Sequence, residues 1–310
     1  MANFDINDIK GVIPAMVTPF DKDENLDENK TRQLIDFLIE KKVNGLYIGG
    51  STGEGFLMSL EERKRLTEIV CEQVAGRIPV IVHVGAIATK LSVELAQHAY
   101  EAGADAISSV PPFYWTFDND SIYQYYKDIS ESTPLPMIVY NVPLAGLMGI
   151  DMIYRLAEIE NVKGIKYTAI SHFEIQMIKD RLGEDFKVYS GSDEMAISGL
   201  LHHADGLIGS FYSMLPDVFI NIYQAMENEE IKEAKRYQEL AVDIIMASLQ
   251  YDYYSTIKLG LKWMGMDMGE VRRPFKPLNE EQISNYKAVL LKLKEKHNVK
   301  DCMLLNAIEE

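Results

Sequence analysis

The sequence predicts an α/β protein that folds as a TIM, or (β/α)8, barrel with a C-terminal helical extension. Short apolar, β-branched segments alternate with amphipathic helical stretches as far as about residue 228, and the strand pattern then stops. Eight predicted strands, spaced by roughly 20–35 residues and each followed by a helical stretch, are typical of such a barrel. A doubly wound sheet has the same alternation, so the periodicity leaves it as the alternative.

Each predicted strand is a short apolar run bounded by glycine, proline or polar residues. The eight runs cover residues 12–17, 45–48, 79–84, 106–110, 137–141, 162–167, 187–190 and 206–210. Among the intervening helices, residues 60–74 carry one apolar face, and Ser59 with Glu62 three residues later forms a capping box at their start. The same pattern predicts helices over residues 89–102 and 151–159.

The chain beyond residue 228 has a helical pattern only. Three helices are predicted there, over residues 231–249, 255–264 and 280–294. The segment RRPFKP at residues 272–277 separates the last two, and no linker or low-complexity stretch interrupts the chain. We therefore assign residues 1–228 to the barrel and residues 229–310 to helices packed on it.

Composition and charge exclude several classes of partner. The formal charge is −16, from 31 basic and 47 acidic residues, whereas a nucleic-acid surface needs a basic face. The longest apolar run, residues 78–88, is too short to span a bilayer, and the polar, acidic start does not have the pattern of a signal peptide. The two cysteines, Cys71 and Cys302, give neither a disulfide framework nor a zinc spacing, which favours a reducing cytoplasm. A small anionic substrate remains compatible with the acidic charge, because a few local donors can hold a carboxylate.

Lys166 is the residue from which the predicted chemistry starts. It lies near the C-terminal end of the strand at residues 162–167, and parallel α/β proteins carry out their chemistry at that end. Burial among apolar and aromatic groups disfavours the ammonium, lowers the pKa of the amine and leaves a nucleophile for a carbonyl. Lys163, at the start of the same strand, is expected to be a solvated surface charge, as most lysines are.

A glycine-rich segment, Gly-Gly-Ser-Thr-Gly-Glu at residues 49–54, follows the second predicted strand. Its three glycines let the backbone turn sharply, and their N–H groups with the hydroxyls of Ser51 and Thr52 can surround a carboxylate. The segment lacks the Gly-Lys-Ser/Thr ending of a phosphate loop and the G-x-G-x-x-G spacing of a dinucleotide loop. An ordinary glycine turn is the alternative interpretation.

Polar residues also follow the fifth, seventh and eighth predicted strands. Tyr140, in the segment YNVP, can direct its hydroxyl into the barrel mouth and transfer a proton, although most buried tyrosines only find a hydrogen-bond partner. Asp193 and Glu194 place two acceptors where a polyol can bind, or they simply cap the next helix. Ser210 adds a further hydroxyl. The aromatic segment at residues 111–115 has the composition of a lid or an interface.

Together these segments resemble a known family. GSTGE, YNVP, GIKYT and GSDEMAISGLLHHADGLIGSFY are of the type, and in the order, found in the N-acetylneuraminate lyase / dihydrodipicolinate synthase superfamily of class I, Schiff-base pyruvate aldolases. The resemblance covers nearly the whole chain and is closest to the N-acetylneuraminate lyase branch. It implies reversible cleavage of N-acetylneuraminate to pyruvate and N-acetylmannosamine, with neither a metal nor a cofactor.

The resemblance also implies roles for individual residues. Lys166 is expected to form the Schiff base, Tyr140 to act as the acid/base group, and Ser51 and Thr52 to hold the pyruvyl carboxylate. The expected sugar-binding residues are Thr168, Gly191, Asp193, Glu194 and Ser210.

Two further tyrosines are assigned roles by the same resemblance. Tyr114 matches a residue that helps to complete a neighbouring subunit's site in the homotetramers of the family. A tyrosine near Tyr254 is expected to close the pocket.

Two departures from the synthase favour the lyase branch. Where the synthase carries an arginine two residues beyond the proline of YNVP, this chain has Ala145, and the synthase lacks the Asp193–Glu194 pair. The alternatives are a 2-keto-3-deoxy sugar acid aldolase, which shares the lysine and tyrosine, and a condensation like that of the synthase. A metal-dependent aldolase has less support, since the six histidines include no H-E-x-x-H pair. A barrel that only binds a keto acid does not need Lys166, Tyr140 and the GSTGE segment together.

Overall fold

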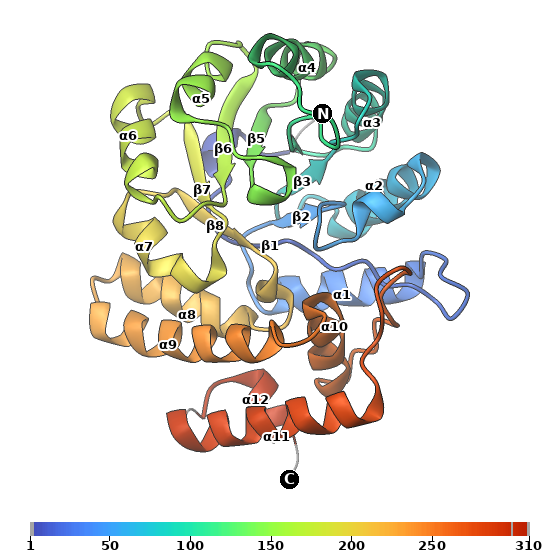
Figure 1. The fold of residues 1–310 in the computed structure, drawn as a ribbon, viewed down its shortest axis with the longest axis vertical. Coiled ribbons are helices and arrows are strands. Elements are labelled where there is room, and N and C mark those ends of the chain that lie inside the picture. The colour runs from blue at the N-terminus through green and yellow to red at the C-terminus, as the bar shows by residue number, and fades with distance from the viewer. Residues whose placement is uncertain (1–2, 299, 309–310) are drawn as a thin grey trace.

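Eight parallel strands form one sheet in a computed structural model that describes residues 3–298 and 300–308. The strands are β1 Gly11–Pro14, β2 Leu46–Ile48, β3 Val80–His83, β4 Ala106–Ser109, β5 Met137–Asn141, β6 Val162–Tyr167, β7 Lys187–Ser190 and β8 Gly206–Gly209. Neighbours follow the order β1-β8-β7-β6-β5-β4-β3-β2, and a parallel bridge between Ala15 and Tyr47 joins the two ends of that order. The closed sheet confirms the barrel and excludes the doubly wound alternative (Figure 1).

Helices follow the strands around the outside of the barrel (Figure 1). They are α1 Glu28–Glu40, α2 Leu60–Val74, α3 Thr89–Glu101, α4 Asn119–Glu131, α5 Ile150–Leu156, α6 Phe173–Leu182, α7 Ala196–Leu201 and α8 Pro216–Glu227. The predicted capping box is present: Ser59 Oγ accepts from the Glu62 N–H, and the Glu62 carboxylate accepts from the Ser59 N–H. Capping satisfies backbone donors at the start of α2, which explains why the prediction of its bounds was correct.

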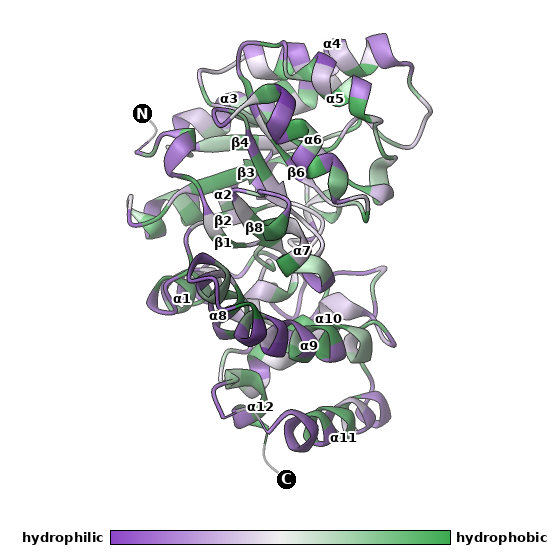
Figure 2. Ribbon diagram, turned by 90° about the vertical axis from the view of Figure 1, so that its left-hand side faces the viewer, coloured by the Kyte–Doolittle hydropathy of each residue, from purple (hydrophilic) through white to green (hydrophobic). Residues whose placement is uncertain are grey.

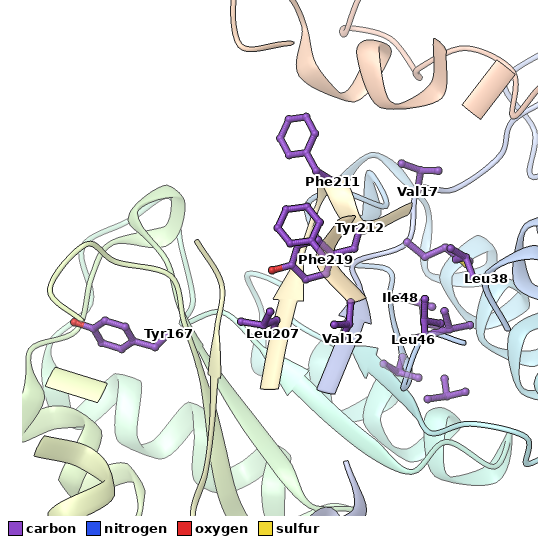
Figure 3. Close-up of a cluster of buried hydrophobic side chains, with 14 of the residues drawn as sticks. Val12, Val17, Leu38, Leu46, Ile48, Tyr167, Leu207, Phe211, Tyr212 and Phe219 are labelled. Atoms are coloured by element: carbon purple, nitrogen blue, oxygen red, sulfur yellow. The ribbon is translucent and has the colours of Figure 1, made fainter. Parts of the chain in front are cut away.

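Side chains alternate between two buried layers, as the two-residue period of a strand requires. The barrel interior contains Ile13, Ile81, Ile138 and Ile208. The layer between strands and helices contains Val12, Leu46, Ile48 and Leu207, which Figure 3 shows with Tyr167 and Phe219. In Figure 2, hydrophobic stretches occur on strands of the barrel, and α9 carries both hydrophilic and hydrophobic stretches.

The C-terminal segment is helical, as predicted, but it contains one helix more than predicted among the described residues. The helices are α9 Ile231–Ser248, α10 Tyr253–Trp263, α11 Glu280–His297 and α12 Met303–Ala307. In both Figure 1 and Figure 2, α9 and α10 lie between the barrel and the pair α11–α12. The assigned boundary at residues 228/229 falls in the turn between α8 and α9, whereas residues 1 and 310 lie outside the described residues. None of the helices described is both long and apolar enough to cross a membrane.

The pairing of β5 with β6 contains one irregularity. Met137 pairs with Val162, but the next residue, Ile138, pairs with Gly164, so Lys163 is left over on the β6 side. Lys163 is exposed, as expected, while Lys166 is buried. Beyond the irregularity, Tyr140 stands directly beside Lys166 in the ladder.

Candidate active site

Lys166 lies buried at the C-terminal end of β6, between two aromatic rings. Its side chain enters the barrel mouth, and Nζ is 4.3 Å from the ring centre of Tyr140 and 4.7 Å from that of Tyr47. Only 3% of the residue is exposed. Burial lowers the pKa of the amine to about 7, against the opposing effect of the Asp193 carboxylate. A large fraction of this amine is therefore uncharged at neutral pH and can attack a carbonyl.

Tyr140 ends up beside Lys166 because β5 and β6 are neighbours in register. It is buried, and its ring also packs edge-on against Tyr47, with 6.1 Å between the ring centres. Burial raises the pKa of the Tyr140 hydroxyl well above 10, and the nearby Tyr254 raises it further. Tyr140 is thus a neutral hydroxyl in the resting site, able to pass a proton but not present as a free phenolate.

The glycine loop, defined here as residues 49–55, connects β2 to the mouth of the barrel. It turns tightly: the Gly55 N–H donates to the Gly50 carbonyl at 3.0 Å, and a Cβ on Gly55 would collide with the Gly49 carbonyl. Thr52 is buried and Ser51 half-buried. The Thr52 hydroxyl is hydrogen-bonded to the Ser210 hydroxyl at 2.7 Å, which ties the loop to the end of β8. Two residues that the sequence predicted for different parts of the substrate are therefore in direct contact.

Asp193 and Thr168 present unpaired polar atoms next to Lys166. Asp193 Oδ2 accepts from the Phe211 N–H at 2.9 Å, but Oδ1 and the Thr168 hydroxyl have no hydrogen-bond partner in the part of the chain described. A Cβ on Gly191 would collide with Thr168 Oγ1 and come within 3.1 Å of Lys166 Cε, so this position requires glycine. Burial raises the pKa of Asp193 to about 7. Unpaired buried polar atoms are costly, so these two are suited to bind a polar ligand.

Three of the predicted residues are placed differently from this group. Glu194, next to Asp193, is exposed. Tyr114 is 83% exposed, and its ring packs edge-on against Trp115 with 4.8 Å between ring centres. Tyr254 is buried and contacts Phe275. Its influence on the pKa of Tyr140 places it within electrostatic reach of the mouth.

Sequence reasoning missed several residues around Lys166. The Tyr47 ring lies against the amine, and its hydroxyl donates to Ser108 Oγ at 3.1 Å. His83 is buried beside Tyr140, with 6.3 Å between ring centres, and burial keeps its pKa well below 6.5, so the imidazole is neutral. Tyr253, next to the predicted Tyr254, stacks on Phe211. The two-residue period of a strand could have placed Tyr47 inside the barrel, because its neighbours in β2, Leu46 and Ile48, both face the helices.

The site can therefore do one kind of chemistry well. An uncharged amine is enclosed by aromatic rings, with a neutral hydroxyl and unpaired acceptors within the same mouth. Such an arrangement suits imine formation with a ketone, followed by proton transfer. Across residues 3–298 and 300–308, no group of three or more His, Cys, Asp or Glu side chains is arranged to hold a metal ion.

Known proteins share this sequence and fold. Residues 8–293 match the dihydrodipicolinate synthetase family. The N-acetylneuraminate lyase of Salmonella paratyphi B is 37% identical over 291 residues, which make up 93% of this chain and 98% of the relative. CdNal from Clostridium difficile, solved in complex with mannosamine, has a TM-score of 0.88 at 36% identity, covering 91% of this chain and 98% of its own. The catalytic lysine mutant of the Ruminococcus gnavus sialic acid aldolase has a TM-score of 0.89 at 31% identity, covering 99% and 98%.

Proposed function

This chain belongs to the dihydrodipicolinate synthetase family, and we propose that it is a class I aldolase that reversibly cleaves N-acetylneuraminate to pyruvate and N-acetylmannosamine. The observation that carries the proposal is the buried, largely uncharged amine of Lys166 against the ring of Tyr140. The choice of sialic acid as substrate is supported by relatives named N-acetylneuraminate lyase, which align over nearly their full length.

In the proposed reaction, Lys166 Nζ attacks the C2 ketone of the open-chain sugar acid and water leaves, giving a protonated imine. Tyr140 relays the proton of the C4 hydroxyl: it takes up this proton while its own hydroxyl proton passes to the substrate carboxylate, because a neutral tyrosine cannot hold a second proton. The C3–C4 bond then breaks, N-acetylmannosamine leaves as the aldehyde, and the bonding electrons move into the imine to form an enamine. Protonation of the enamine at C3 and hydrolysis of the imine release pyruvate and free Lys166.

We propose that the carboxylate of the keto acid binds at Ser51 and Thr52 in the glycine loop. The loop's tight turn and its position beside β8 support this assignment. For the sugar chain we propose binding by Thr168, Gly191, Asp193, Glu194 and Ser210. The unpaired Thr168 hydroxyl and Asp193 Oδ1, next to Lys166, are the atoms that favour it.

The proposal extends to assembly, organisation and compartment. We propose a homotetramer in which Tyr114 helps to complete a neighbouring subunit's site, supported by the 83% exposure of Tyr114 and the 62% exposure of Trp115.

We keep the barrel at residues 1–228 and its helical extension at residues 229–310 as one working unit. We also propose the cytoplasm as its compartment, because Cys71 and Cys302 are free thiols.

Reductive trapping tests the proposal. Borohydride with pyruvate is expected to leave a covalent adduct that maps to Lys166, and N-acetylneuraminate is expected to be cleaved faster than 2-keto-3-deoxygluconate. The absence of an adduct excludes the Schiff-base mechanism. Faster cleavage of the shorter sugar acid assigns the enzyme to the alternative aldolase instead.

The rate of trapping is expected to depend on pH near neutrality. Burial depresses the pKa of Lys166 to about 7, so the uncharged fraction rises as the pH rises. With cyanoborohydride and pyruvate, the initial rate should increase about tenfold from pH 6 to pH 8 and then level off. A rate that climbs steadily to pH 10 is the behaviour of an ordinary solvated lysine and contradicts the prediction.

Asp193→Asn is the matched variant for this pH profile. The Asp193 carboxylate raises the pKa of Lys166, so its removal is expected to shift the step to lower pH. Because Asp193 itself titrates near 7, the step in the unaltered enzyme belongs to the pair. A step that stays in place in the variant shows that the two groups do not interact.

Glu194→Ala is expected to weaken the binding of the sugar more than that of pyruvate. Glu194 is exposed next to the mouth, so its loss removes a charge-assisted hydrogen bond without disturbing buried groups. The KM for N-acetylneuraminate should rise by about five- to tenfold, while the pyruvate concentration for half-maximal trapping changes less than about twofold. An equal loss for both ligands removes the reason to assign Glu194 to the sugar chain.

A further inference from the structure

A buried ion pair joins the glycine loop to the C-terminal extension. Lys258 Nζ, on α10, lies 2.7 Å from Glu54 Oε1, and the side chains are 2% and 0% exposed. The second oxygen, Glu54 Oε2, accepts from the Arg272 N–H at 2.7 Å. Lys258 also donates to the Glu270 carbonyl at 2.8 Å. Both carboxylate oxygens of Glu54 are therefore held by residues more than two hundred positions later in the chain.

The two charges of the pair lie away from solvent, and each stabilises the charged form of the other. Burial raises the pKa of Glu54 and lowers that of Lys258, and each is opposed by the charge of the other. The Phe20 ring lies against both Lys258 Nζ, 4.6 Å from its centre, and the Arg272 guanidinium, 4.2 Å from its centre. Such pairs contribute little net stability, but they hold geometry tightly, because either charge alone is strongly disfavoured.

Glu54 lies near the C-terminal end of the glycine loop and helps to fix the loop's backbone. Its backbone is in the left-handed region, with φ at 55°, and its N–H donates to the Ser51 carbonyl at 3.0 Å. One residue earlier, the Gly53 carbonyl accepts from the Thr18 hydroxyl at 2.6 Å. Thr52 is fixed to Ser210. The loop thus has three anchors, and the one at its C-terminal end is supplied from outside the barrel.

We infer that Glu54 and Lys258 are positioning residues, through which α10 and the segment that follows it set the placement of the Ser51 and Thr52 hydroxyls for the carboxylate of a keto acid. The inference rests on the proposed function. It predicts that loosening the pair weakens carboxylate binding while leaving the Lys166 amine competent. The helical extension is then part of the binding apparatus and not merely a cover for the barrel.

A comparison of two ketones separates loop placement from general damage. Pyruvate carries the carboxylate and acetone lacks it, yet both can be trapped on Lys166 by borohydride. In Glu54→Gln, the pyruvate concentration for half-maximal trapping is expected to rise about tenfold, as for loss of one to two buried hydrogen bonds, while the rate with acetone stays within about twofold. A parallel fall with both ketones overturns the inference.

The double variant Glu54→Gln/Lys258→Met guards against a variant that does not fold. Because it removes both charges, its thermal unfolding midpoint is expected to be higher than that of Glu54→Gln and close to that of the unaltered enzyme. Pyruvate trapping is expected to remain at least about fivefold weaker than in the unaltered enzyme. Recovery of pyruvate trapping together with the unfolding midpoint shows that the pair has only a stabilising role.

Lys179→Met is the matched control. Lys179 is buried and pairs with the partly buried Asp205, 3.1 Å away, ahead of β8 at the opposite end of the barrel from the glycine loop. This variant should lower the unfolding midpoint and leave the ratio of pyruvate to acetone trapping unchanged. A changed ratio means that any lost ion pair disturbs the loop. If the unaltered enzyme itself is not trapped by pyruvate, the proposed function fails, and the inference fails with it for that separate reason.

Discussion

Lys166→Met is expected to abolish cleavage of N-acetylneuraminate and reductive trapping by pyruvate. Methionine has a similar length and fits an apolar site, so the variant should fold, but it has no amine with which to form an imine. The fall in kcat/KM should be on the order of 10⁴-fold or more, as expected for loss of a covalent nucleophile. The measurement is pyruvate release by the variant and the unaltered enzyme at equal concentrations.

Lys163→Met provides the matched control on the same strand. Lys163 is exposed on β6, three residues before Lys166, so its replacement should leave kcat/KM within about twofold. The Schiff-base assignment is wrong if Lys166→Met retains measurable cleavage, or if the borohydride adduct in the unaltered enzyme maps to another lysine.

Tyr140→Phe is expected to separate capture of the ketone from breakage of the carbon–carbon bond. The substitution keeps the ring that lies 4.3 Å from Lys166 Nζ and removes only the hydroxyl. Loss of a general acid/base typically lowers the rate by about 10²–10⁴-fold, so kcat for N-acetylneuraminate should fall within that range. Trapping by pyruvate should fall much less, because the amine stays buried between its aromatic neighbours.

Tyr189→Phe is the corresponding control within the barrel. The Tyr189 hydroxyl donates to the Ile9 carbonyl at 2.9 Å, and residue 9 precedes β1, at the N-terminal end of the barrel. This variant should lose some stability and keep its kcat. Equal loss of cleavage and trapping in Tyr140→Phe indicates that the hydroxyl is already needed to form the imine. That result contradicts the proposal that the Tyr140 hydroxyl acts in the breakage of the carbon–carbon bond.

The fold was predictable because its determinants are local. The strands β5, β6 and β7 and the helix α2 have the bounds that the sequence predicted. Elsewhere the predicted strands ran too far, since Val17, Val84 and Val110 continue the apolar pattern beyond the last ladder residue. Val17 and Val84 are buried in the layer between strands and helices and Val110 in the barrel interior, so hydrophobicity alone could not distinguish them from strand residues. The short helix α12 was missed because five residues are too few to show a helical period.

The site was only partly predictable, because several of its contacts join residues that are distant in the sequence. Lys166 and Tyr140 could be found from the sequence alone, because polar side chains at the ends of apolar strands are unusual. The ion pair of Glu54 with Lys258 has no local pattern, because its partners meet only after the barrel has closed and α10 has packed against it. The different burial of Asp193 and Glu194 depends on the short turn after β7, which composition does not specify.

The unpaired Lys163 has a consequence for how this enzyme tolerates changes in length. Val162, Ile165 and Tyr167 all face the surrounding helices, and the odd spacing from Val162 to Ile165 is possible only because Lys163 is an extra, unpaired residue. Deleting Lys163 would leave Val162 opposite Met137 and Gly164 opposite Ile138, so regular alternation would still place Lys166 beside Tyr140. A lost codon at this position is therefore expected to leave every residue of the proposed mechanism in place.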